Sequence, residues 1–143
     1  GKKQQFALPW QDKRPLTILV GDSQVELGDW YGLFGGSIAA RNCGLSRAKI
    51  ADVSELVSAI ADREPKNVVL MCGVNNLGNR DSVASCTANY EQLILNVQSI
   101  LKPAKIIVLS VMPVRESAVD QRSHELNGRI SKFNNELASI CAR

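Results

Sequence analysis

The chain has 143 residues, of which 45% are apolar and 22% are charged, and its formal net charge is +3. This length and composition fit one globular domain and exclude an intrinsically disordered chain. The basic residues form no continuous stripe, which argues against nucleic-acid binding, and no apolar run is long enough to cross a bilayer.

Strands and helices are expected to alternate after a polar N-terminal arm, residues 1–15, so that the domain spans residues 16–143. Short apolar runs predict strands, and apolar residues at helical spacing predict the helices between them. The expected strands are Leu16–Val20, Ile38–Leu45, Asn67–Cys72 and Lys105–Met112. The expected helices cover residues 24–34, a segment from Ile50 to before Pro65, a segment through Tyr90 to Leu101, and a segment from Leu126 to the chain end.

This alternation predicts an α/β fold with a parallel sheet covered on both faces, in a flavodoxin-like three-layer α/β/α arrangement. Ligands of such sheets bind at the carboxyl ends of the strands. Polar residues follow three of the predicted strands at that edge, in the stretches Gly21-Asp22-Ser23, Gly73-Val74-Asn75-Asn76 and Pro113-Val114-Arg115. The sequence therefore predicts a functional site there.

Ser23 has two interpretations that are compatible with each other. Asp22 or Ser23 can cap the helix that follows, because both residue types cap helices well. Alternatively, the Ser23 hydroxyl is a nucleophile at a helix N-terminus, where backbone N–H groups and the helix dipole favour developing negative charge. Asn75 is likewise either a turn residue or a side-chain amide donor to an oxyanion.

Cofactor chemistry finds little support in the sequence. The chain has a single histidine and four widely spaced cysteines with no C-x-x-C pair, which argues against a zinc site. Neither a G-x-G-x-x-G nor a G-x-x-x-x-G-K-[ST] motif occurs, so we expect no organic cofactor. We expect the cysteines to be reduced, which favours a cytoplasmic location and leaves secretion open.

The ordered polar stretches resemble the SGNH (GDSL-type) hydrolase family, especially its compact esterases of the platelet-activating-factor acetylhydrolase type. Gly21-Asp22-Ser23 resembles the family's first block, which makes Ser23 the nucleophile. The loop Asn42–Ser46, which includes Gly44, resembles the second block, and Gly73–Asn76 resembles the third, which makes Asn75 the oxyanion asparagine. The resemblance implies a serine esterase that acts on a small-molecule ester without a cofactor.

The sequence departs from the family at three points. Arg47 stands where the second block has a glycine that donates its backbone N–H to the oxyanion hole, and Asn76 replaces the usual aspartate. The side chain of Arg47 is expected to face solvent or to hold an anionic substrate group. The family's last block, Asp-x-x-His, would lie beyond residue 143, together with the last strand and helix.

The missing block leaves Ser23 without an evident general base. His124 is a candidate substitute, although an exposed histidine near a helix start is the commoner case. We therefore expect residues 1–143 alone to be almost inactive, with the catalytic histidine downstream. The strand Lys105–Met112 would then have a bare edge, open to self-association or to completion by a C-terminal fragment. The alternative function is a non-catalytic ligand- or glycan-binding domain on the same fold.

Overall fold

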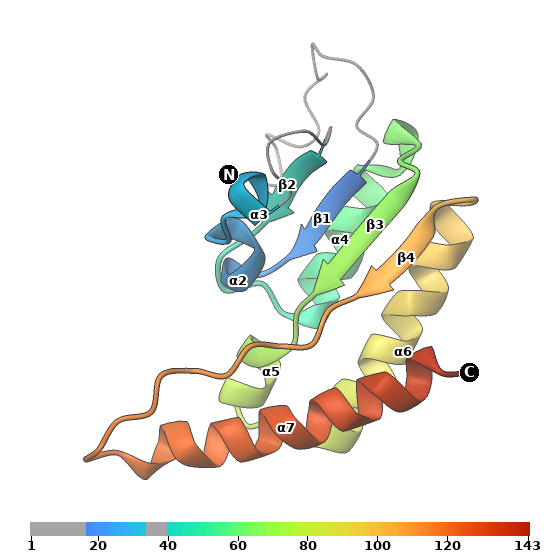
Figure 1. The fold of residues 1–143 in the computed structure, drawn as a ribbon. Coiled ribbons are helices and arrows are strands. Elements are labelled where there is room, and N and C mark those ends of the chain that lie inside the picture. Colours follow the sequence, from blue (N-terminus) through green and yellow to red (C-terminus); the bar gives the residue numbers. More distant parts are fainter. Residues whose placement is uncertain (1–16, 34–39) are drawn as a thin grey trace.

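The computed structural model describes residues 17–33 and 40–143. The four strands form one parallel sheet in the order β2-β1-β3-β4, which confirms the predicted fold class (Figure 1). Each strand is preceded or followed by helices. The strands are β1 Thr17–Gly21, β2 Ala40–Gly44, β3 Asn67–Met71 and β4 Lys105–Val108. The helices are α2 Ser23–Glu26, α3 Trp30–Leu33, α4 Ile50–Ala59, the 3₁₀ turn η1 Ala61–Arg63, α5 Val74–Gly78, α6 Val83–Ile100 and α7 Gln121–Cys141. The predicted arm, residues 1–15, and the predicted strand start at Ile38 lie outside the described residues.

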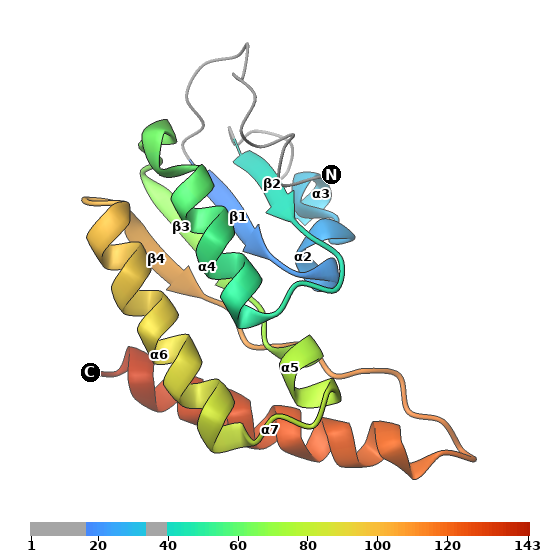
Figure 2. The ribbon, with the colours of Figure 1, turned by 180° about the vertical axis from the view of Figure 1, so that it is seen from behind.

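Helices lie on both faces of the sheet. Helices α4 and α6 cover one face (Figure 2), and the short helices α2 and α3 lie beside β1 and β2 on the other (Figure 1). The larger buried apolar cluster lies between the sheet, α4 and α6 and extends to α7. A smaller cluster on the other face joins Leu19, Val25, Val69 and Met71. Among the described helices, none combines the length and the apolar character needed to cross a membrane.

The long helices follow the predicted apolar stripes. In α6, Ser82 is the N-cap and accepts a hydrogen bond from the Ser85 backbone N–H at 3.0 Å, which fixes where the helix begins. In α7, Ile130, Phe133 and Leu137 are buried on one face, as their spacing predicted. The Phe133 ring meets the Tyr90 ring edge to face, with 5.8 Å between centroids, so that α7 is attached to α6 by aromatic packing.

Within the described residues, the prediction of a single helix over residues 24–34 is wrong. The chain there forms two short helices, α2 and α3, separated by Leu27, Gly28 and Asp29. Leu27, which the helical spacing placed on the buried face, is 81% exposed. Gly28 disfavours a continuous helix because glycine loses the most backbone freedom on folding. Phe34, at the end of the predicted helix 24–34, lies outside the described residues.

The last strand is shorter than predicted. β4 ends at Val108, although the apolar run continues to Met112. The segment after Leu109 leaves the sheet, and side-chain amides take over its backbone hydrogen bonds. Asn134 binds both the N–H and the carbonyl of Val111 at 2.8 and 2.9 Å. Gln24 does the same for Met112, and Asn127 for Val114.

Candidate active site

The turn after β1 decides which residue caps α2. Asp22 is the N-cap, and its Oδ1 accepts a hydrogen bond from the Gln24 backbone N–H at 2.9 Å. Ser23 is the first residue of the helix and is partly exposed. Within the described part of the chain, no hydrogen bond engages its hydroxyl. Asp22 therefore caps α2, and the hydroxyl of Ser23 is not used in capping.

Asp22 is fully buried beneath this turn. Burial raises the pKa of its carboxyl group to about 6, against the opposing hydrogen bond from Gln24. The second oxygen, Oδ2, has no hydrogen-bond partner in the described residues. A negative charge here also raises the pKa of the buried Cys72 thiol, although burial of the thiol is the larger cause. The carboxyl group of Asp22 thus lies inside the protein, next to the proposed nucleophile in sequence.

Helix α2 has one turn only, so its macrodipole is far smaller than that of the long helix predicted from the sequence. Any stabilisation of negative charge at Ser23 must come from individual N–H groups at the end of the helix.

The loop after β2 is attached directly to this turn. The Leu45 N–H donates to the Gly21 carbonyl oxygen at 2.9 Å, and the Ser46 N–H donates to the Glu26 carboxylate at 2.7 Å. Gly44 touches α2 so closely that a Cβ there would lie 2.2 Å from the Glu26 backbone nitrogen. Only glycine allows this approach, and it places the second loop against the turn that carries Ser23.

Arg47 is exposed, and its backbone is left-handed, with φ of 66°. The side chain faces solvent, one of the two predicted outcomes. The family resemblance places a glycine at this position. Glycine adopts a positive φ at little cost, whereas for an L-residue this backbone conformation is less favourable by roughly 1 kcal/mol. The chain has therefore kept the glycine-like backbone conformation with an arginine in its place.

The turn after β3 brings Asn75 to the same loop. Gly73 precedes α5 with φ of 122°, and a Cβ there would lie 2.7 Å from the Phe133 ring. The Asn75 Nδ2 donates to the Ala48 carbonyl oxygen at 2.9 Å. Ala48 follows Arg47, so this bond attaches the Asn75 amide to the loop that carries Arg47. One hydrogen of that amide is used by Ala48, and the other is available to a ligand.

Asn76 has a structural role in the same turn. It is buried, its Oδ1 accepts from the Ile50 N–H at 2.9 Å, and its Nδ2 donates to Asp81 Oδ2 at 3.1 Å. An amide can accept one bond and donate the other, which a carboxylate cannot do. Asn76, which replaces the family's usual aspartate, can therefore donate a hydrogen bond to the Asp81 carboxylate, whereas an aspartate would repel it.

We expect Asn76→Asp to lower the free energy of unfolding by roughly 1–3 kcal/mol at pH 7, because two carboxylates would then meet in a buried turn. Urea unfolding followed by circular dichroism measures this change. In Asn76→Asp/Asp81→Asn the donor and acceptor are exchanged, and most of the stability should return. A stable single variant, or no recovery in the double variant, would contradict this account.

His124 lies at the start of α7, away from any contact with Ser23 that the described residues show. Its side chain is 77% exposed, and its Nδ1 is 3.4 Å from Glu116 Oε1. The pair resembles a surface ion pair more than a catalytic one. Whether His124 serves as a base stays a prediction.

Three residues join the turns of the site, and of these only Asn42 was identified from the sequence, as the first residue of the second block. Asn42 donates to the carbonyl oxygens of Val25 and Glu26 and accepts from the Gly44 N–H, which joins β2 to α2. Glu26 binds Ser46, and Gln24 binds Met112 across 88 residues of sequence. A polar side chain beside each turn was the only signal in the sequence, and the partner of each side chain could not be predicted from it.

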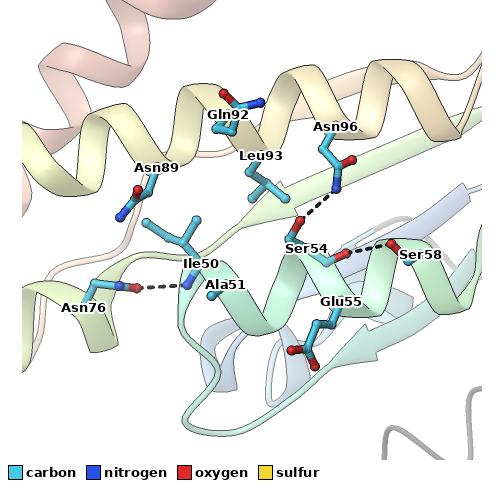
Figure 3. A pocket seen from close by; sticks show the side chains of 10 residues that line it. All are labelled: Ile50, Ala51, Ser54, Glu55, Ser58, Asn76, Asn89, Gln92, Leu93 and Asn96. Carbon is cyan, nitrogen blue, oxygen red and sulfur yellow. Dashed lines mark hydrogen bonds between the residues drawn. The ribbon is translucent and has the colours of Figure 1, made fainter.

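A groove of about 580 Å³ lies between α4 and α6 (Figure 3). Asn96 donates to the Ser54 hydroxyl across it at 2.8 Å, and Asn76 lies at one end beside Ile50. Ser23 and Asn75 are not part of its lining. The groove therefore adjoins the candidate site only through Asn76. The described residues contain no group of three or more His, Cys, Asp or Glu side chains suited to a metal ion.

The sheet order and the serine and asparagine turns at its carboxyl edge define an α/β protein with the SGNH-hydrolase fold. The chain belongs to the GDSL-like lipase/acylhydrolase family, whose model matches residues 19–143. The comparison with curated proteins returned no match.

Solved structures share this fold. One is a Streptococcus pneumonia protein named for platelet activating factor, with a TM-score of 0.83, 22% identity, and coverage of 99% of this chain and 68% of that one. A second is a member of the lipolytic protein G-D-S-L family from Veillonella parvula, with a TM-score of 0.70, 17% identity, and coverage of 88% and 72%. A third is the acetyl xylan esterase AlAXEase, with a TM-score of 0.69, 19% identity, and coverage of 88% and 72%.

Proposed function

We propose that this chain carries the nucleophile and the oxyanion hole of a serine ester hydrolase. The observation that supports this most is the direct attachment of three turns to one another. The turn with Ser23 binds the second loop through Gly21 and Leu45, and the turn with Asn75 binds the same loop through Ala48. Ser23, Arg47 and Asn75 come from separate parts of the sequence and lie in the turns and the loop that these bonds connect.

In the proposed reaction, the Ser23 Oγ attacks the ester carbonyl carbon, and its proton passes to a histidine. The carbonyl oxygen becomes an oxyanion, which accepts hydrogen bonds from the Ser23 and Arg47 backbone N–H groups and from the Asn75 amide. Collapse of this intermediate expels the alcohol, which takes the proton from the histidine. Water then hydrolyses the acyl-serine in the same manner, with the histidine as general base.

We place this histidine, oriented by an aspartate, in sequence that follows Arg143. The chain has one histidine, and His124 is exposed and paired with Glu116. The proposal therefore assigns the base to a segment outside these residues.

Labelling with a fluorophosphonate probe tests the proposal, because the probe reacts with activated serines. We expect the gene product with the sequence following Arg143 to be labelled, with the adduct on the peptide that contains Ser23. Residues 1–143 alone should be labelled at least about 100-fold more slowly, since the base contributes about 10²–10⁴-fold. Equal labelling of both proteins would place the base within this chain and favour His124. No labelling of either, with esters left intact, would favour the non-catalytic ligand- or glycan-binding domain.

We also propose that the outer edge of β4 accepts a further strand, from a second copy or from a C-terminal fragment. Within the described residues β4 pairs only with β3, and Ile107 on β4 is 37% exposed. An exposed apolar edge strand is a ready template for strand pairing.

A further inference from the structure

A second cavity, of about 550 Å³, lies where the end of α5 meets the first half of α7 and the segment after β4. The two helices lie side by side in both ribbon views (Figures 1 and 2). The lining comes from these elements. It consists of Gly78, Arg80, Val114, Arg122, Ser123, Glu125, Leu126 and Arg129. Neither Ser23 nor Asn75 belongs to it.

Positive charge dominates this cavity. Arg122 and Arg129 are seven residues apart on α7, which places them on one face of the helix, with Leu126 between them. Arg80 comes from the opposite side, just after the C-cap of α5. Glu125 is the single carboxylate of the lining.

Two of the arginines lack a counter-charge. Arg122 pairs with Asp120 at 3.0 Å, whereas neither Arg80 nor Arg129 forms an ion pair in the part of the chain that the structure describes. Arg129 is half-buried and donates to the carbonyl oxygens of Leu77, at 2.5 Å, and Asp81. These bonds hold its guanidinium in place without neutralising it. A half-buried cation without an anionic partner is unfavourable, and a bound anion would supply that partner.

The backbone at Arg80 adds a separate observation. Its φ is 68°, a left-handed conformation just beyond the end of a helix, where glycine is the usual residue. The chain thus carries an arginine where the backbone favours glycine. A side-chain function at Arg80 would explain why this strain is tolerated.

We propose that this cavity binds the phosphate group of a small phosphomonoester. Guanidinium groups match the geometry of phosphate oxygens, and a phosphate has enough oxygens to accept bonds from Arg80 and Arg129 together. A carboxylate uses both of its oxygens on one guanidinium. Val114 and Leu126 provide an apolar wall for the organic part of the molecule, and the volume lies within the range of small-ligand sites, about 300–1,000 Å³. This inference is independent of the proposed ester hydrolysis.

The test is a titration of the ¹⁵N-labelled protein with glycerol 3-phosphate, inorganic phosphate and acetate at constant ionic strength, followed by amide chemical shifts. We expect saturable shifts at Gly78, Arg80 and Ser123 with both phosphates and much weaker shifts with acetate. Arg80→Gly should weaken binding by about tenfold or more, because charge-assisted bonds to one guanidinium are lost. Glycine suits the backbone at this position, so the variant should melt at the same temperature as the wild type or higher.

Arg143→Gly is the control, because it removes another exposed arginine, one outside the cavity, and should leave the affinity unchanged. Equal weakening by both variants would show non-specific charge attraction and overturn the proposal. So would shifts that centre on Ser23 and Asn75, or the absence of saturation. Binding to phosphatidic acid vesicles, without binding of either soluble phosphate, would identify a membrane surface instead and also overturn it.

Discussion

Replacement of Ser23 by alanine should lower kcat/KM for ester hydrolysis by about 10⁴-fold or more, because the reaction then lacks its nucleophile. Covalent fluorophosphonate labelling should disappear with it. The measurement uses the gene product that includes the sequence after Arg143 and a short-chain ester of a chromogenic alcohol. Residual hydrolysis would come from the oxyanion donors alone.

Folding should be unchanged in this variant, because Asp22, and not Ser23, caps α2 and the hydroxyl makes no hydrogen bond within the described residues. The melting temperature should therefore stay within about 2 °C of the wild type, as expected when no hydrogen bond is lost. Ser58→Ala, at an exposed serine on α4, should keep full labelling and turnover. Full turnover in Ser23→Ala would remove this residue from the reaction.

The strands could be predicted from the sequence because burial on both faces of a parallel sheet requires continuous apolar runs. Asn67–Met71 is such a run, and the structure has the strand there. The end of β4 could not be predicted in this way. Leu109 to Met112 looks like more of the same strand, but the Gln24 and Asn134 amides take its backbone out of the sheet. These contacts are far apart in sequence and leave no local pattern.

The prediction of one helix over residues 24–34 was wrong because apolar periodicity shows only where side chains would lie if a helix formed. Gly28 separates two single turns, and Leu27 faces solvent. At the site, residue type and position at the strand ends led to Ser23 and Asn75. The role of Asn76 depends on Asp81 and on the Ile50 N–H, 26 residues away, so it emerged only from the structure.

Asn75→Ala tests the oxyanion hole and should lower kcat by about 10²–10³-fold with little change in KM, because the lost donor acts mainly on the charge that develops in the transition state. The variant also loses the bond to the Ala48 carbonyl oxygen, which should cost about 1 kcal/mol of stability. Steady-state kinetics and urea unfolding of the same preparations separate these two effects.

Asn134→Ala is the control for the structural part of this result. It removes a comparable amide, the one that binds the N–H and carbonyl of Val111, and it should reduce stability at least as much. Because Asn134 touches the segment after β4 and not the loop with Arg47, kcat should fall by less than about threefold, a change near 0.6 kcal/mol in barrier. Equal losses of kcat in the two variants would mean that the loss of activity follows general destabilisation and would contradict an oxyanion role for Asn75. A loss confined to Asn75→Ala, in kcat and not in KM, would place the effect at the turn after β3, as donation of the second amide N–H to the developing oxyanion requires.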